Sequence, residues 1–104
     1  SHVKEYIGRV ILATHPGSEF ETESTRKYVR YGASPRAAQS IILAAKVNAL
    51  RQGRHNVAFA DVRRAAKPAL RHRLILNFEG EAEGVRPDDL VDQILAAVPE
   101  AQTV

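Results

Sequence analysis

The stretch GASPRAAQSIILAAKVNALRQG, residues 32–53, decides the fold. Ser34 is a residue type favoured at a helix N-cap, and Pro35 suits the first helical position, where no backbone N–H is needed. Gly53 is placed to end the helix as its C′ residue. The sequence therefore predicts a helix over about residues 36–52. Apolar residues cover so much of its circumference that we expect a central, buried helix, through Ala37, Ala38, Ile41, Ile42, Ala44, Ala45, Ala49 and Leu50.

Three further helices are expected on either side of this one. Apolar residues at the i, i+4, i+7 and i+8 spacing predict an amphipathic helix from Val3 to about Thr14. After the central helix, another is expected from about Phe59 to Ala66. A break near Lys67 and a new turn from Pro68 to about His72 follow, because proline disrupts a helix interior. The last helix is predicted from about Pro87 to Val98.

The two remaining segments lack clear helical periodicity. Residues 16–34 are expected to form a long loop whose end is anchored to the core by Tyr28, Val29 and Tyr31. Residues 74–86 are expected to form a connector that fills part of the core with Leu74, Leu76 and Phe78. The predicted fold class is all-α, a small bundle of four to five helices. We expect residues 3–104 to form a single helical domain cut from a longer protein, with residues 1–2 a tag remnant.

Composition excludes several classes of protein. The 104 residues include no cysteine, which excludes a disulfide framework, a thiolate nucleophile and a cysteine-based zinc site. The histidines are scattered without ligand spacing, so no metal site is expected from His2, His15, His55 and His72. No apolar run is long enough for a membrane span, and no leader is visible, so a cytoplasmic location is expected. No G-x-x-x-x-G-K-[ST] loop occurs, so the chain alone is not expected to be an enzyme acting on a nucleoside triphosphate.

Charge is distributed unevenly along the chain. Residues 36–78 carry nine Lys and Arg against one acidic residue, whereas residues 79–104 carry one Arg against seven acidic residues. The acidic tail is therefore suited to dock on the basic middle segment or on a basic neighbour. The same basic segment leaves open a nucleic-acid-binding module or a protein-interaction module as alternative functions.

Arg36 carries the most informative chemistry. It falls in the first helical turn, where a cation opposes the helix dipole, and residues that break a local rule are candidates for function. A helix N-terminus offers unpaired N–H groups to an anion, and the planar guanidinium fits a phosphate. The alternative is an exposed arginine whose aliphatic stem covers apolar surface.

Four strings in register resemble one known family. GASPRA, opening an alanine-rich helix, resembles the sensor-2 motif of MoxR-type AAA+ ATPases. RQGRHNVAFADVRRAA, PALRHRLILNFEGEAEG and the terminal DDLVDQIL follow in that family's order. The similarity runs from about Val3 to Val98, so the chain resembles the C-terminal α-helical lid of such an ATPase without its nucleotide-binding core.

The resemblance implies a mechanism. Arg36 is expected to be the sensor-2 arginine that contacts the γ-phosphate of ATP, with Mg²⁺ and the Walker motifs supplied by the core. Gly32 and Ala33 lack bulk and are expected to admit the adenosine closely, and Ser34 is expected to fix the helix start. The family further implies a ring, commonly a hexamer, with chaperone-like remodelling activity and partners that contain von Willebrand factor A domains.

The basic cluster Arg71, His72 and Arg73 has two interpretations. Cations near a helix C-terminus are favourable to the dipole and suit a capping role. The resemblance implies instead that they contact the core or a neighbouring subunit.

Overall fold

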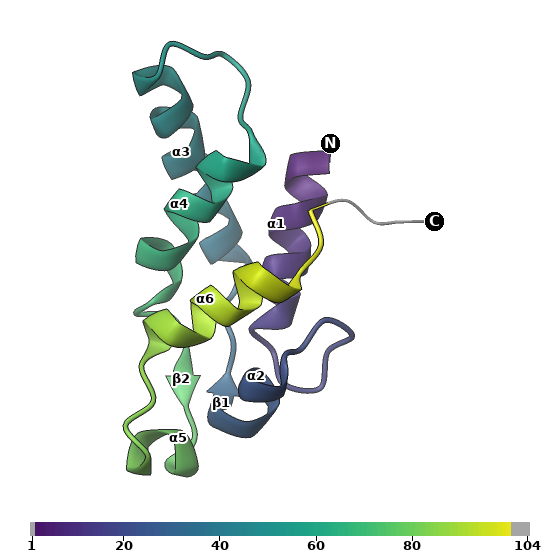
Figure 1. Ribbon diagram of the computed structural model, residues 1–104, viewed down its shortest axis with the longest axis vertical. Coiled ribbons are helices and arrows are strands. Elements are labelled where there is room, and N and C mark those ends of the chain that lie inside the picture. The colour runs from purple at the N-terminus through teal and green to yellow at the C-terminus, as the bar shows by residue number, and fades with distance from the viewer. Residues whose placement is uncertain (1, 101–104) are drawn as a thin grey trace.

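The computed structural model describes residues 2–100, which form six helices and one two-stranded sheet (Figure 1). The order is α1 (His2–Ala13), α2 (Glu23–Tyr28), β1 (Val29–Tyr31), α3 (Pro35–Arg51), α4 (Phe59–Leu70), β2 (Ile75–Leu76), α5 (Phe78–Ala82) and α6 (Pro87–Ala97). The all-α fold class is confirmed. Residue 1 and residues 101–104, which belong to the expected tag remnant and domain end, lie outside the described residues.

Four helices build the core. The longest, α3, has its most extensive contact with α4, and α6 crosses from α4 towards α1 (Figure 1). The largest fully buried apolar side chains come from these four helices: Tyr6, Ile7, Val10, Ile41, Val62, Leu70, Leu90, Val91 and Ile94. The predicted helices at the two ends of the domain are confirmed, since α1 and α6 bury the apolar stripes that their periodicity indicated.

The central helix is confirmed in its bounds but not in its burial. Gly53, at φ 75°, ends α3 in a Schellman motif, in which its N–H donates to Leu50 and the Arg54 N–H donates to Ala49. Only one stripe of α3 is buried, formed by Ala37, Ile41, Ala45 and Ala49. The expectation of a central, buried helix therefore holds for this stripe only, because no element among residues 2–100 covers the opposite face of α3.

The expected break near Lys67 was also wrong. Pro68 lies inside α4, which continues to Leu70. Pro68 has no backbone N–H, so it cannot donate the helical hydrogen bond of its position. The disruption is limited because α4 ends two residues later. Buried side chains on both sides of it, Ala66 and Leu70, hold the last turn against the core. Packing outweighs the local cost of the proline.

The two connectors contain structure that periodicity did not reveal. Thr22 caps α2 by accepting from the Thr25 N–H, and Asn77 caps α5 by accepting from the Gly80 N–H at 2.8 Å. Asn77 also joins the connectors, since its side-chain amide donates to the Lys27 carbonyl. The strands β1 and β2 pair antiparallel, with Val29 opposite Leu76 and Tyr31 opposite Ile75.

The anchoring side chains were only partly predicted. Val29 and Leu74 are buried, and Tyr28 and Leu76 are half-buried against the core. Tyr31 and Phe78 were assigned to the core and are exposed, Phe78 to 89%. Phe78 opens a helix of five residues whose only buried residue is Gly80, so its side chain has no core surface to reach.

Candidate functional site

Arg36 lies in the first turn of α3 and is exposed. Within residues 2–100 its side chain makes no hydrogen bond or ion pair with the rest of the domain. Ser34 occupies the N-cap position with extended backbone, and Pro35 follows as the first helical residue. The Ser34 side chain makes no cap hydrogen bond, so the start of the helix is set by other contacts.

Those contacts come from the end of α1. The Thr14 hydroxyl donates to the Ile11 carbonyl at 2.6 Å and accepts from the Ala33 N–H at 2.9 Å. His15 Nε2 lies 2.7 Å from the Ala33 carbonyl oxygen, so this nitrogen carries the proton and donates. The N–H and the carbonyl of Ala33 are therefore bound by two consecutive residues, Thr14 and His15. These contacts fix the backbone three residues before Arg36.

The small side chains before Arg36 have a structural role. A Cβ on Gly32 would lie 2.5 Å from the Thr14 carbonyl oxygen, and Ala33 is fully buried. The absence of bulk at these two positions therefore allows the GASPRA segment to pack on α1. Ala33 is therefore not accessible to a ligand, whereas Gly32 is half-buried and Ser34 and Arg36 are exposed.

Sequence reasoning missed Thr14 and His15 as positioning residues. Thr14 was read as part of an apolar stripe, and His15 was considered only as a metal ligand. The available signal was the place of Thr14 on the apolar stripe, which predicts that its side chain is buried. A buried hydroxyl requires hydrogen-bond partners.

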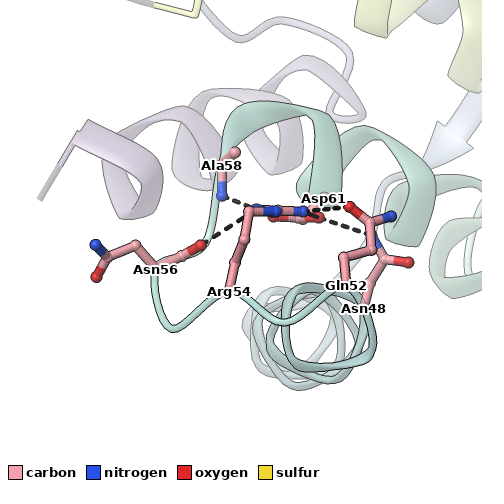
Figure 2. A network of polar contacts seen from close by, with 6 residues as sticks. All are labelled: Asn48, Gln52, Arg54, Asn56, Ala58 and Asp61. Atoms are coloured by element: carbon pink, nitrogen blue, oxygen red, sulfur yellow. Dashed lines mark hydrogen bonds and ion pairs between the residues drawn. The ribbon is translucent and has the colours of Figure 1, made fainter.

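A second polar network joins α3 to α4 (Figure 2). Arg54 binds Asp61 through both terminal nitrogens, at 2.8 and 2.7 Å. Asp61 also accepts from the Asn48 side chain at 2.6 Å and from the Ala58 N–H at 2.8 Å. The Arg54 guanidinium and then the Ala58 N–H hold the pKa of Asp61 well below its usual range.

This network stabilises the start of α4, whose N-cap residue, Ala58, has no capping side chain. Asp61 lies in the first turn of this helix, where its negative charge is favourable to the helix dipole. The Asp61 side chain is only 1% exposed and accepts from the N–H of the N-cap residue, Ala58. This is the N3 half of a capping box, and the alanine side chain cannot supply the other half. The helix start is therefore well defined, and the turn of residues 52–58 is tied to both helices.

The three residues of the Arg71, His72 and Arg73 cluster have different partners in the structure. Arg71 Nε donates to Asp88 at 3.0 Å, and Arg73 donates to the Ser40 hydroxyl at 3.2 Å. His72 is exposed and has no partner among residues 2–100. The backbone N–H groups of Arg71 and Arg73 donate to the Lys67 and Leu70 carbonyls at 3.0 and 2.9 Å. The cluster therefore caps α4 through its backbone, whereas the two arginine side chains bind elsewhere.

Across residues 2–100 no three His, Asp or Glu side chains come together in a way that holds a metal ion. None of the described helices has the length and apolar character needed to cross a membrane.

Comparison with known proteins defines the class. The family model for the AAA lid domain matches residues 21–94. The chain belongs to the AAA lid domain family.

The relatives specify the kind of AAA protein. The chain is 34% identical over 102 residues to the chaperone MoxR1 of Mycobacterium tuberculosis (strain ATCC 25618 / H37Rv), covering 96% of this chain and 27% of that protein. It is 33% identical over 85 residues to the protein MoxR of Paracoccus denitrificans, covering 80% of this chain and 25% of that protein. A crystal structure from Cytophaga hutchinsonii ATCC 33406, provisionally named an ATPase, superposes with a TM-score of 0.91 at 34% identity, covering 98% of this chain and 31% of that one.

The fold, the order of its motifs and these relatives together make this chain the lid domain of a MoxR-type AAA+ ATPase. It spans about a quarter of the length of the MoxR proteins that it matches.

Proposed function

We propose that this domain completes the ATP site of a full-length MoxR-type ATPase, with Arg36 as the residue that contacts the γ-phosphate. One observation carries the proposal. Arg36 is an exposed cation without an internal partner, on a helix whose start is fixed by two hydrogen bonds to Ala33. An arginine that serves only the fold has no need of such placement.

The chemistry of phosphoryl transfer suits this arrangement. Most of the catalytic effect comes from positioning and from stabilising the charge on the transferred group. The Arg36 guanidinium supplies donors to the phosphate oxygens, and the fixed helix start positions the backbone from which it extends. Gly32 and the short side chain of Ser34 leave room beside Arg36 for the adenosine.

The domain supplies one side of the site only. It lacks a phosphate-binding loop, and its described carboxylates form no cluster that fits Mg²⁺. The triphosphate and Mg²⁺ are therefore assigned to the nucleotide-binding core of the longer protein. In isolation the chain is expected to bind ATP in the millimolar range or more weakly and to show no turnover, because one arginine and a few amides bury little of the nucleotide.

The contact also provides a switch. Loss of the γ-phosphate on hydrolysis removes the Arg36 interaction and releases the lid to rotate relative to the core. This motion drives the chaperone-like remodelling that we assign to the full-length protein, as a ring, commonly a hexamer, in the cytoplasm. Proteins with von Willebrand factor A domains are the proposed partners, and His72 and Arg73 remain candidate interface residues.

The test is Arg36→Ala in the full-length protein. At saturating ATP we expect kcat to fall about 100-fold or more, because one preorganised donor to the developing charge is lost. Arg36→Lys keeps the charge but not the planar fork and should recover only part of the rate.

Arg86→Ala is the matched control, since Arg86 is an exposed arginine beside the first proline of a helix and has no ion pair within residues 2–100. Normal turnover by the Arg36→Ala protein would show that Arg36 is not the sensor.

A further inference from the structure

Helix α3 exposes a second apolar stripe. Three of the large apolar side chains exposed on the described domain lie on this helix: Leu43 at 65%, Val47 at 56% and Leu50 at 62%. Their spacing of four and three residues places them on one face. This face is opposite the stripe that α3 buries in the core.

The exposed stripe is in line with Arg36. At about 100° per residue, positions 36, 43, 47 and 50 fall within an arc of about 60°. At about 1.5 Å per residue, the line from Arg36 to Leu50 is about 21 Å long. A body that brings a phosphate to Arg36 therefore lies over the same face of α3.

Unpaired cations flank the far end of the stripe. Val47 lines a groove between α3 and α4 together with Ala44, Asn48, Ala65 and Pro68, and Arg51 and Arg64 also line it. Neither arginine has an ion pair or hydrogen bond among residues 2–100. The groove therefore fits an apolar side chain flanked by carboxylates.

A symmetric contact with a second copy does not fit this surface. Pairing two stripes face to face would place Arg36, Arg51 and Arg64 of one copy among the same cations of the other. Such like-charge contacts are unfavourable. The related MoxR proteins are more than three times as long as this chain, so a covering module is available in a full-length protein.

We propose that the stripe formed by Leu43, Val47 and Leu50 is the docking surface for the module that holds the nucleotide. That module presents an apolar patch to the stripe and carboxylates to Arg51 and Arg64. This inference rests on the proposed role of Arg36 and extends it from one side chain to one face of α3. Docking along this face sets the orientation in which Arg36 meets the phosphate.

Thiol labelling of the full-length protein tests the docking. The domain has no cysteine, so Val47→Cys introduces a thiol that peptide mapping assigns without ambiguity. With a non-hydrolysable ATP analogue bound, its alkylation should be about tenfold or more slower than in the isolated domain, since only an opened state exposes it. Leu50→Cys gives a second reading on the same stripe, and Phe78→Cys is the exposed control that should react equally in both proteins.

A photo-crosslinker attached at Val47→Cys identifies the occupant. Crosslinks to the nucleotide-holding module support the inference, and crosslinks to another lid domain overturn it. Equal alkylation of Val47→Cys and Phe78→Cys in the full-length protein also overturns it. If that occurs while Arg36→Ala still abolishes turnover, the docking surface is wrong and the proposed function stands. Normal turnover of Arg36→Ala would instead overturn the proposed function.

Discussion

Gly32 shows how one small residue positions the site. Its α-carbon lies against the carbonyl of Thr14, where a Cβ would be 2.5 Å from the oxygen and 2.7 Å from the carbonyl carbon. Backbone atoms at that distance cannot move aside as a flexible side chain does. Glycine is required here by close approach, because the GASPRA segment crosses the end of α1 at contact distance.

Gly32→Ala is therefore expected to destabilise the domain by about 1–3 kcal/mol, the usual cost of forcing an extra methyl group into a packed site. Urea unfolding of the isolated chain measures the change. Gly8→Ala is the matched control, because Gly8 lies in α1 with no atom within 4 Å of an added Cβ. In the helix interior that change should stabilise by about 0.8–1.0 kcal/mol. Stabilisation by both substitutions would refute the close contact with Thr14.

At the scale of elements, the Arg54 and Asp61 network defines where α4 begins. Asp61 accepts from the N–H of the N-cap residue, Ala58, and the network bridges α3 to α4 through Asn48. Because Asp61 is buried and receives four hydrogen bonds, its charged form belongs to the folded state.

Asp61→Asn is expected to lower the free energy of unfolding at pH 7. The folded-state pKa of Asp61 is depressed, so its contribution is present above the unfolded pKa of about 3.9 and is lost as pH falls towards the folded value. The stability difference between the two proteins should therefore shrink below about pH 4. Urea unfolding at pH 7, 5, 4 and 3 measures it.

Asp92→Asn is the comparison for that series. Asp92 pairs with Lys67 at 2.8 Å but is 53% exposed. Exposed pairs contribute about 0–1 kcal/mol, so this change should be small. A constant difference between Asp61→Asn and the parent at all four pH values would contradict the role of the carboxylate charge.

The sequence predicted the elements that periodicity specifies. The stripes of α1, α3 and α6 are long enough to show a helical period, and glycine and proline mark their ends. The short α2 and α5 were missed, because five or six residues carry no period and their starts depend on single caps, Thr22 and Asn77. The break expected near Lys67 does not occur, because the buried side chains of Ala66 and Leu70 hold the last turn of α4 against the core.

The candidate site was predicted less completely than the fold. GASPRA identified Arg36 and its helix start, since both depend on local sequence. The partners that fix Ala33, Thr14 and His15, directly follow α1 more than fifteen residues earlier, and no local pattern connects them. Leu50 of the exposed stripe was assigned to the core, and Leu43 and Val47 were not assigned, because composition alone does not say how many faces of a helix are covered.

At the scale of the whole molecule, opposite charges join the basic middle segment to the acidic tail. Arg63 and Lys67 on α4 and Arg71 at its C-cap recur every four residues and pair with Glu100, Asp92 and Asp88. The predicted docking of the acidic tail on the basic middle segment is confirmed. With these cations neutralised internally, Arg36, Arg51 and Arg64 remain as cations on the face that we assign to docking.

Nucleotide discrimination by the full-length protein tests the central claim most directly. The affinities of ATP analogue and ADP are measured by titration for the parent and for Arg36→Ala. If Arg36 contacts the γ-phosphate, the substitution should weaken binding of the non-hydrolysable ATP analogue by about tenfold, equivalent to about 1.4 kcal/mol, and leave ADP affinity unchanged. An equal loss for both nucleotides, or no loss for either, would contradict the assignment of Arg36 to the γ-phosphate.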